Sequence, residues 1–199
     1  TRIRMGLELM AGEQPAPAFR AEILRNIAEL DQLVDEILLA SRLDAREADV
    51  RTVEPIDLIG LLAEECARVG VELNLSPGTA EVTVPGVAKL LRRAVRNLLE
   101  NALRHGGRTG RASEVGAELG TEGDQAVLHV DDRGPGVPPA QRERIFEPFY
   151  RLPGASEREG GVGLGLALVK SIAERHHGQV SCDNRAGGGA RFTLRLPLM

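Results

Sequence analysis

The chain has 199 residues, of which 42% are hydrophobic and 27% charged, and its formal net charge at pH 7 is -4. This balance is typical of globular proteins and excludes a disordered, collagen-like or coiled-rod chain. Aromatic residues make up only 3% of the sequence, and tryptophan is absent. Because single-stranded nucleic acids are bound by stacking rings on a basic surface, nucleic acid is not an expected partner.

Membrane and disulfide signals are weak in this sequence. No apolar run approaches the roughly 20 residues that a membrane-spanning helix needs, and no basic-then-apolar leader opens the chain. Cys66 and Cys182 lie far apart without a Cys-x-x-Cys pattern, which argues against a zinc site and a disulfide scaffold. We therefore expect a soluble chain in a reducing, cytoplasmic compartment. Because it begins with Thr1 rather than Met, we also expect a fragment of a longer protein.

The first 44 residues carry two apolar stripes at helical spacing, separated by a break at residues 12–17. The longer stripe runs from Phe19 to Ile37 with apolar residues every three or four positions. We predict a helical hairpin over residues 1–44. Stripes this wide are poorly buried by two helices alone, so a second copy is the natural partner, in a dimeric four-helix bundle. The alternative is a hairpin that packs on its own globular domain.

Residues 45–54 are charged and aperiodic, which predicts a linker before a larger domain at residues 55–199. The spacing of apolar residues predicts helices over residues 56–69, 87–104, 138–146 and 164–176. It predicts strands over residues 71–75, 81–84, 117–119, 125–130, 179–183 and 190–196. Because these elements follow no regular βαβ order, we expect an α/β sandwich with helices on one face of a mixed sheet. The whole chain is then an α+β protein.

Polar residues border the apolar stripe of the helix predicted over residues 87–104. Asn97 and Asn101 lie about 40° apart around its axis, and Arg104 lies about 20° to the other side of Asn97. An amide oxygen at such an edge can ligate Mg²⁺, which takes only one or two protein ligands when phosphates supply the rest. A nearby arginine can bind a phosphate. Taken alone, two solvated or capping asparagines are the simpler interpretation.

The strand predicted over residues 125–130 leads into two carboxylates, Asp131 and Asp132. Gly134 and Gly136 come next, at a spacing that lets a ligand approach the backbone closely. A buried Asp132 carboxylate needs a donor, and a purine amino group would supply a charge-assisted bond of roughly 1.5 to 3 kcal/mol. An ordinary turn is the alternative for this motif alone. We expect Asp131 to be solvated, because neighbouring strand residues point to opposite faces.

A glycine-rich segment, residues 160–165, opens the last predicted helix. Free amides and the helix dipole favour a phosphate at such an N-terminus. A dinucleotide-binding motif is excluded, because Leu166 stands where a third glycine is required and a polar loop replaces the preceding strand. There is also no Gly-Lys-Ser or Gly-Lys-Thr of a P-loop. A glycine turn without a ligand is the alternative.

These three segments occur in this order, with Arg-Ile-Phe-Glu-Pro-Phe-Tyr-Arg at residues 144–151 between the last two. Together they resemble the N, G1, F and G2 boxes of the sensor histidine kinases, whose catalytic domain has the Bergerat ATP-binding fold. The match spans roughly residues 91–192, and four ordered motifs at plausible spacing are highly specific. The predicted hairpin is also similar to the dimerisation and histidine-phosphotransfer domain of that family.

At the phosphate end, the resemblance implies that Asn101 ligates Mg²⁺ and that Asn97 acts beside it toward the phosphates of ATP. Arg104 occupies the position of a basic phosphate-contacting residue, and Arg151 that of a lid cation. Together with Asn97, these two arginines are the catalytic residues that the resemblance implies. Residues 146–162 would form a lid over the nucleotide.

At the adenine end, the resemblance assigns the adenine amino group to Asp132. His105 stands where the family often has a tyrosine against the adenine, and its imidazole offers a smaller face. The other nucleotide-binding positions that the resemblance implies are Gly134, Gly136, Val137, Gly161, Gly163, Leu164, Gly165 and Leu166. For Phe146, Phe149 and Tyr150, core packing is at least as good an expectation as ligand contact.

The family's phosphate acceptor is a histidine in a segment like His-Glu-Leu-Arg-Thr-Pro, and no histidine of this chain has that context. Residues 1–4 resemble the positions directly after such a segment, so we expect the acceptor just upstream. We expect structural roles for His129, inside a strand, and for His176 and His177, at a helix end where a cation is favourable.

The resemblance implies the cytoplasmic transmitter portion of a sensor histidine kinase. Such a chain would bind Mg-ATP, transfer the γ-phosphoryl group to a histidine, and pass it to an aspartate of a response regulator receiver domain. We expect a homodimer through the hairpin and an inner-membrane anchor in upstream segments only. One alternative is an ATPase of the same fold, similar to DNA gyrase or heat-shock chaperones, which needs a glutamate base where this chain has Asn97. Another is a degenerate ATP-binding dimeric scaffold.

Overall fold

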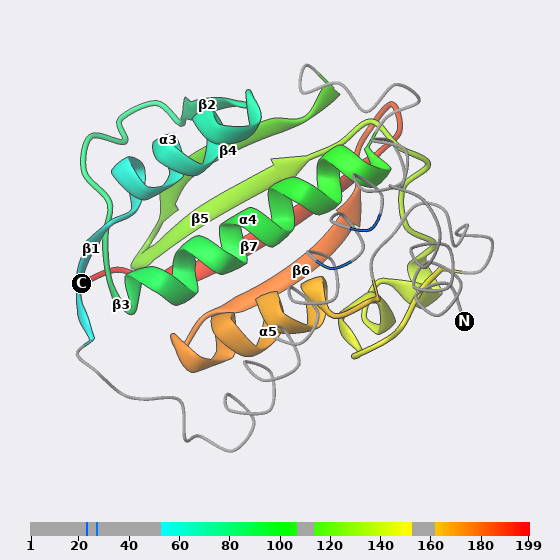
Figure 1. The fold of residues 1–199 in the computed structure, drawn as a ribbon. Coiled ribbons are helices and arrows are strands. Elements are labelled where there is room, and N and C mark those ends of the chain that lie inside the picture. Colours follow the sequence, from blue (N-terminus) through cyan, green and yellow to red (C-terminus); the bar gives the residue numbers. More distant parts are fainter. Residues whose placement is uncertain (1–22, 24–26, 28–52, 107–113, 153–161) are drawn as a thin grey trace, which may run out of the picture. The chain divides into compact units, whose positions relative to one another are not determined.

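The computed structural model describes residues 23, 27, 53–106, 114–152 and 162–199 (Figure 1). The chain divides into two compact units, Thr1–Leu39 and Ala40–Met199. Ile23 and Ile27 are helical, and the rest of the predicted hairpin lies outside the described residues, as does most of the predicted linker.

The described part of the second unit contains a five-stranded mixed sheet, a two-stranded sheet and three α-helices. In chain order the elements are β1 (Glu54–Asp57), α3 (Leu58–Val69), β2 (Glu72–Leu75), β3 (Thr83–Gly86), α4 (Ala88–His105), β4 (Gly116–Glu122), β5 (Gln125–Asp131), the 3-10 turns η2 (Pro139–Gln141) and η3 (Arg144–Phe146), α5 (Gly165–Arg175), β6 (Gln179–Asn184) and β7 (Ala190–Pro197). The sheet order is β2-β4-β5-β7-β6, with a parallel β2–β4 pair and antiparallel neighbours elsewhere. Helices α3, α4 and α5 lie on one face of it (Figure 1), so the predicted layering of helices on a mixed sheet is confirmed.

The core lies between the helices and the sheet. Helix α4 contributes its whole apolar stripe, in which Leu91, Ala94, Val95, Leu98, Leu99 and Ala102 are buried. Alternate residues of β5 and β7, including Leu128, Val130 and Leu194, are buried as well. The stripe follows the 3.6-residue period of a helix, so one face of α4 is apolar along its length. Packing of this apolar face on the sheet therefore fixes the direction in which Asn97, Asn101 and Arg104, at the polar edge of α4, point.

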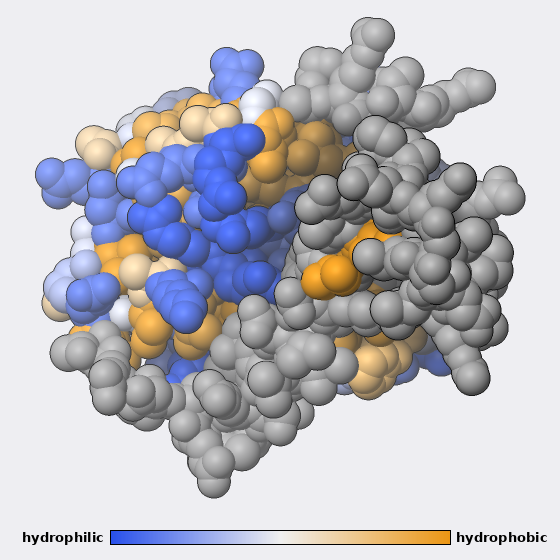
Figure 2. Space-filling view, viewed as in Figure 1, coloured by the Kyte–Doolittle hydropathy of each residue, from blue (hydrophilic) through white to orange (hydrophobic). Residues whose placement is uncertain are grey.

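Helices α3 and α4 are joined by an ion-pair network that the sequence did not suggest. Glu65 on α3 is 3% exposed, and its carboxylate accepts hydrogen bonds of 3.1 and 3.2 Å from the Arg96 guanidinium on α4. Burial raises the pKa of Glu65, but the hydrogen bonds and charge of Arg96 outweigh that effect and leave the pKa below its ordinary value. Hydrophilic side chains gather over these two helices in Figure 2. The network ties α3 to α4 one residue before Asn97.

Several element bounds differ from the sequence prediction: β4 is longer than predicted, β3 is shifted by two residues, and two segments differ in the type of element. Ile56 pairs with Val84 in a separate two-stranded sheet of β1 and β3, so α3 begins only at Leu58. Strand β1 was not predicted, because its partner lies far along the chain. The helix predicted over residues 138–146 is two 3-10 turns instead, in a segment where consecutive prolines remove backbone donors.

His176 connects the C-terminal end of α5 to the start of α4. Its Nδ1 is 2.7 Å from the Ile172 carbonyl oxygen, and its Nε2 accepts a 3.1 Å hydrogen bond from the Val87 amide. The ring is 7% exposed, and burial lowers its pKa. A neutral ring with the proton on Nδ1 satisfies both contacts. The structural role of His176 is confirmed, but a cation there is wrong, because burial outweighs the attraction of the helix end.

Across the described part of the chain, no helix combines the length and the apolar character that crossing a membrane requires.

Candidate functional site

Asp132 lies just past the end of β5 and is 4% exposed. Its Oδ1 accepts hydrogen bonds from the amides of Gly134, at 2.8 Å, and Ala190, at 2.9 Å. No donor among the described residues reaches Oδ2, and no cation there pairs with this carboxylate. A charged acceptor in this state gains a hydrogen bond when another donor is supplied. Oδ2 is therefore the atom that a bound ligand can satisfy.

The residues after Asp132 form a loop that leaves no room for side chains on its inner side. A Cβ on Gly134 would lie 2.2 Å from the His105 carbonyl oxygen. Gly136 has a φ of +74°, and a Cβ on it would lie 2.8 Å from Asn184 Oδ1. Gly134 is thus required by the close approach of the α4 backbone, and Gly136 by its positive φ and the nearby Asn184 side chain. Val137 ends the loop and is 6% exposed.

The C-terminal end of α4 lies directly against this loop. The Arg133 amide donates to the Gly106 carbonyl at 2.6 Å. A Cβ on Gly106 would come within 2.5 Å of the Asp132 Cβ. Arg104 and His105, in the last turn of α4, are exposed. The structure thus brings the end of the asparagine-bearing helix to the loop that carries Asp132.

Asn97 joins α4 to the start of α5. Its side chain is 6% exposed, and its Nδ2 donates a 3.1 Å hydrogen bond to the Gly165 carbonyl. Asn101 lies one turn further along α4 and is half-buried. Within the described part of the chain its side chain makes no hydrogen bond, so its amide oxygen can ligate a cation. The asparagine and glycine motifs therefore meet in space, through Asn97 and Gly165, which are 68 positions apart in the sequence.

The glycine-rich segment forms the start of α5. Gly163 has a φ of +79°, and a Cβ there would lie 2.8 Å from the Tyr150 carbonyl oxygen. Leu164 is 4% exposed and precedes the helix without capping it by its side chain. The first-turn amides, those of Gly165, Leu166 and the next residue, have no acceptor within the helix. These amides are donors of the kind that an anion can accept from, so anion binding at this end stays a prediction. Gly161 lies outside the described residues.

The segment around η3 has mixed surroundings. Phe146 is 6% exposed and meets Phe192 edge-on, with ring centroids 6.5 Å apart, so core packing is confirmed for Phe146. Phe149 is 61% exposed, so core packing is wrong for this residue. Tyr150 carries the Arg144 guanidinium 4.4 Å above its ring. Arg151 is half-buried, and most of the predicted lid lies outside the described residues.

Asp131 is not solvated, contrary to the sequence expectation. Its two carboxylate oxygens each accept a 2.7 Å hydrogen bond from the Arg191 guanidinium, and its side chain is 14% exposed. Arg191 lies directly opposite it on β7. The expectation fails because the outer face of the sheet supplies cross-strand partners for its polar residues.

His129 has the structural role predicted for it. Its Nδ1 lies 3.0 Å from Thr193 Oγ1 on the neighbouring strand β7. Burial and the nearby charge of Arg191 lower its pKa. The ring is thus held in the sheet and lies outside the motif segments.

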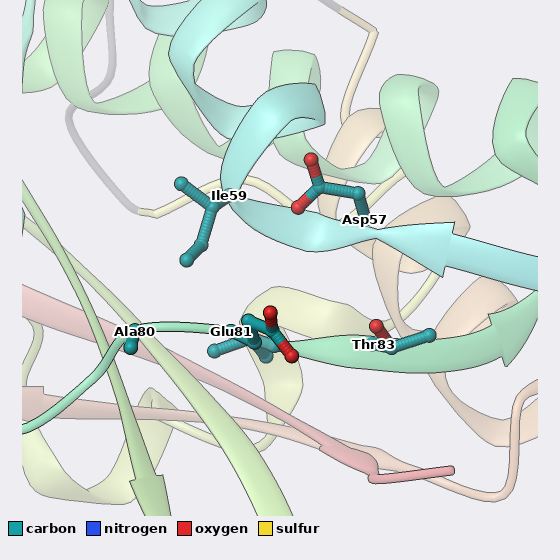
Figure 3. A pocket seen from close by; sticks show the side chains of 6 residues that line it. Asp57, Ile59, Ala80, Glu81 and Thr83 are labelled. Atoms are coloured by element: carbon teal, nitrogen blue, oxygen red, sulfur yellow. The ribbon is translucent and has the colours of Figure 1, made fainter.

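A separate hollow of about 440 Å³ lies where β1 leads into α3 and the chain enters β3. Figure 3 shows the Asp57 and Glu81 carboxylates at its two sides. Its lining residues are Asp57, Ile59, Ala80, Glu81, Val82 and Thr83. None of them belongs to the motif segments, so this hollow is not part of the candidate site.

Comparison with known proteins gives the class of this chain. Residues 86–199 match the model of the family described as histidine kinase-, DNA gyrase B-, and HSP90-like ATPases, and the chain belongs to that family. It is similar to sensor histidine kinase GtrS of Pseudomonas aeruginosa, with 40% identity over 99% of this chain and 38% of the relative. It is 37% identical to sensor protein RstB of Escherichia coli K12, over 99% of this chain and 44% of the relative. The chain thus spans less than half the length of these curated relatives.

A solved structure gives the same result. The crystal structure of the ATP binding domain of PrrB from Mycobacterium tuberculosis matches with a TM-score of 0.58 and 32% identity, over 74% of this chain and 98% of that domain. The resemblance to sensor histidine kinases that the motifs indicated is therefore confirmed, and so is ATP as the nucleotide class of the fold.

Proposed function

We propose that this chain is the cytoplasmic transmitter portion of a sensor histidine kinase. It binds Mg-ATP and directs the γ-phosphoryl group to a histidine, from which an aspartate of a response regulator receiver domain receives it. The observation that supports this proposal best is the buried Asp132 carboxylate, with Oδ1 saturated by two amides and Oδ2 open to a ligand. The family and the relatives support the same activity.

At the adenine end, Asp132 Oδ2 accepts the exocyclic amino group of the base. This charge-assisted bond contributes roughly 1.5 to 3 kcal/mol. The glycines at 134 and 136 let this loop pack closely against His105 and Asn184. Guanine would present a carbonyl oxygen where adenine has its amino group, so two acceptors would face each other. The site therefore selects adenine by its hydrogen-bond pattern.

At the phosphate end, the residues fit a metal-bound triphosphate. Asn101 supplies a neutral amide oxygen for Mg²⁺, and the described residues contain no cluster of three or more His, Cys, Asp or Glu side chains. This donor set suits an ion whose other ligands are phosphate oxygens and waters. When bound, Mg²⁺ neutralises phosphate charge and orients the transferred group. The α5 amides, Arg104 and Arg151 hold the remaining phosphate oxygens.

Phosphoryl transfer needs positioning and charge neutralisation rather than a covalent intermediate on this domain. Asn97 serves positioning, because its amide bonds to Gly165 and so fixes α4 against the phosphate-binding end of α5. ATP hydrolysis by activated water would need a general base at this position. An asparagine amide cannot take up the proton, which favours the kinase over an ATPase of the same fold.

The proposal extends to the organisation of the chain. Residues 1–44 form the dimerisation and phosphotransfer hairpin, which pairs with a second copy in a four-helix bundle. Residues 45–53 form the linker, and the catalytic domain with the Bergerat fold begins one residue earlier than the sequence predicted, because Glu54 already belongs to β1. The helical stripes of the first segment and the family of the second support this division.

Titration calorimetry with Mg-ATP tests the binding step. We expect saturable binding to the chain, and much weaker binding of Mg-GTP, because the guanine oxygen faces the Asp132 carboxylate. Removing Mg²⁺ with a chelator should weaken ATP binding, since the triphosphate charge is then neutralised only by protein groups. Absence of heat, together with no displacement of a fluorescent ATP analogue, would count against the site.

A further inference from the structure

The turn between β6 and β7, residues 184–190, packs against the loop that carries Asp132. The guanidinium of Arg185 makes two contacts there. Its Nε lies 3.1 Å from Asp131 Oδ2, and its Nη1 donates a 3.2 Å hydrogen bond to the main-chain carbonyl of Asp132. One planar cation therefore holds the side chain of one aspartate and the backbone of the next.

The preceding residue of the turn holds the other end of the same loop. Asn184 Oδ1 accepts a 2.8 Å hydrogen bond from the Val137 amide. A Cβ at Gly136 would lie 2.8 Å from this oxygen, so the asparagine side chain fits into the bend that Gly136 makes. Asn184 and Arg185 thus fix the loop at Val137 and at Asp132.

The backbone of the turn completes the contact. Ala190 and Asp132 exchange two hydrogen bonds, because the Asp132 amide donates to the Ala190 carbonyl at 2.9 Å and the Ala190 amide donates to Asp132 Oδ1 at 2.9 Å. A Cβ on Gly189 would lie 2.0 Å from the Asp132 carbonyl oxygen. The Arg185 amide closes the turn on the Gly189 carbonyl at 3.0 Å. The turn therefore sets both the position of Asp132 and the hydrogen bonding of its Oδ1.

We propose that Arg185 and Asn184 are positioning residues for adenine recognition: they fix the direction of Asp132 Oδ2 without touching the nucleotide. This inference rests on the proposed function, because it takes Oδ2 as the acceptor of the adenine amino group. Hydrogen bonds weaken steeply when their angle departs from linear. If the loop can tilt at Asp132, the hydrogen bond to the adenine amino group weakens. The contacts of the phosphates with the start of α5 are then unaffected.

A purely structural role makes a different prediction. If the two residues only stabilise the β6–β7 turn, their loss lowers the thermal unfolding midpoint and affects all nucleotides equally. The informative quantity is therefore the ratio of the dissociation constants of purine riboside triphosphate and ATP, both with Mg²⁺. The first ligand lacks only the amino group, so the ratio isolates the contact at Oδ2.

The experiment measures this ratio by displacement of a fluorescent ATP analogue, beside thermal unfolding, for the wild-type chain, Arg185→Ala, Arg185→Lys and Asn184→Ala. The matched control is Arg195→Ala on β7. The Arg195 side chain is 26% exposed, against 24% for Arg185, and it pairs with Glu122 at 3.3 Å on the same sheet. Among the described residues, the hydrogen bond and ion pair of Arg195 go to Glu122 and not to the Asp132 loop.

We expect Arg185→Ala to reduce the ratio of the two dissociation constants about fivefold, because the hydrogen bond between Asp132 Oδ2 and the amino group is then less well aligned. Arg185→Lys should restore part of it, because an ammonium can reach only one of the two partners. Asn184→Ala should reduce the ratio to a smaller extent, and Arg195→Ala should leave it unchanged. If Arg185→Ala does not fold, the other two variants decide the question by the same ratio.

An unchanged ratio in Arg185→Ala and Asn184→Ala, with or without a lower unfolding midpoint, would overturn the inference. Failure of the proposed function looks different: the wild-type chain and Asp132→Asn would then show the same ratio, whatever residue stands at 185. A large effect of Asp132→Asn with no effect at residues 184 and 185 would remove the positioning role alone.

Discussion

At the scale of single residues, the candidate site depends on atoms that the protein leaves unsatisfied. Asp132 is buried yet has one oxygen without a described donor, and Asn101 has a half-buried amide without a hydrogen bond to any described residue. A carboxylate oxygen of this kind can accept a hydrogen bond from a ligand, and an amide oxygen of this kind can ligate a cation. These two side chains, one at each end of the proposed nucleotide, are therefore the most direct signs of function.

Replacement of Asp132 by asparagine tests this interpretation. The neutral amide keeps the volume but loses the charge of the acceptor, so Asp132→Asn should weaken Mg-ATP binding by about 2 kcal/mol, roughly thirtyfold in dissociation constant. Calorimetry measures the change. Asp124→Asn, at an exposed position in the β4–β5 turn, is the control and should bind like the wild type. Equal dissociation constants for all three proteins would exclude Asp132 from the adenine role.

Much of the site was predictable at this scale. Asp132, Asn97, Asn101 and the glycines stand in short motifs whose chemistry is local. The ion pair of Asp131 with Arg191 was not predictable, because it joins residues 60 positions apart on two strands. Asn184 and Arg185 were missed for the same reason. Their only sequence signal is a position just before the glycines of a predicted hairpin turn.

At the scale of elements, the site depends on how α4 and α5 are held together. Asn97 links the middle of α4 to the start of α5, and His176 links the end of α5 to the residue before α4. The two helices are thus connected at both ends of their contact. Since each helix carries one part of the proposed phosphate end, their relative position determines the geometry of that proposed site.

The His176 contact makes stability depend on pH. Burial lowers the pKa of His176 in the folded chain, whereas the unfolded chain takes up a proton near 6.5. Between these two values the unfolded state binds more protons, so the free energy of unfolding falls as the pH falls below about 6.5. The stabilisation is fully present above that pH. Arg175 and His177 act in the same direction, because their positive charge disfavours a protonated ring.

Chemical denaturation at pH 5 to 8 measures this dependence. His176→Gln should show a smaller loss of unfolding free energy between pH 7 and pH 5 than the wild type, because it has nothing to titrate there. His129, whose pKa is also lowered, contributes the remaining slope in both proteins. His177→Gln, at an exposed neighbouring position, should change the slope less than His176→Gln does, because it removes only one of the smaller causes that lower the pKa of His176. Parallel curves for wild type and His176→Gln would rule out this contribution.

At the scale of the whole molecule, bound Mg-ATP should stabilise some regions of the chain more than others. The proposed site involves the Asp132 loop, the end of α4 and the start of α5, whereas β1 and β3 form their own two-stranded sheet. A ligand stabilises those regions whose opening breaks its contacts. Because the small sheet holds none of the proposed ligand contacts, we expect bound nucleotide to protect it less than the site.

Hydrogen exchange should show this pattern. At a concentration of Mg-ATP about 100 times its dissociation constant, amides in the Asp132 loop and the first turn of α5 gain up to about 2.7 kcal/mol of protection. Peptides from β1 and β3 should exchange at unchanged rates. Mass spectrometry of the exchanged chain measures both. Uniform protection, or protection confined to the hollow between β1 and β3, would place the nucleotide elsewhere.

Local sequence was sufficient to specify most of the elements and the chemistry of the motifs. The apolar period of α4 set which face is buried, and so placed Asn97, Asn101 and Arg104 on one edge. Alternation along β5 and β7, with glycines at the turns, predicted two of the antiparallel strands. These features depend on neighbours within a few positions, where backbone geometry translates spacing directly into direction.

How those elements meet became clear only from the folded chain. Folding paired Ile56 with Val84 in an unexpected strand, kept His176 neutral, and placed Asn184 and Arg185 against the Asp132 loop. Each of these facts depends on burial or on a partner far along the chain. The spacing of residues within one segment carries no information about such partners. The free energy of a buried contact depends on both residues that make it, and the second residue lies in another segment.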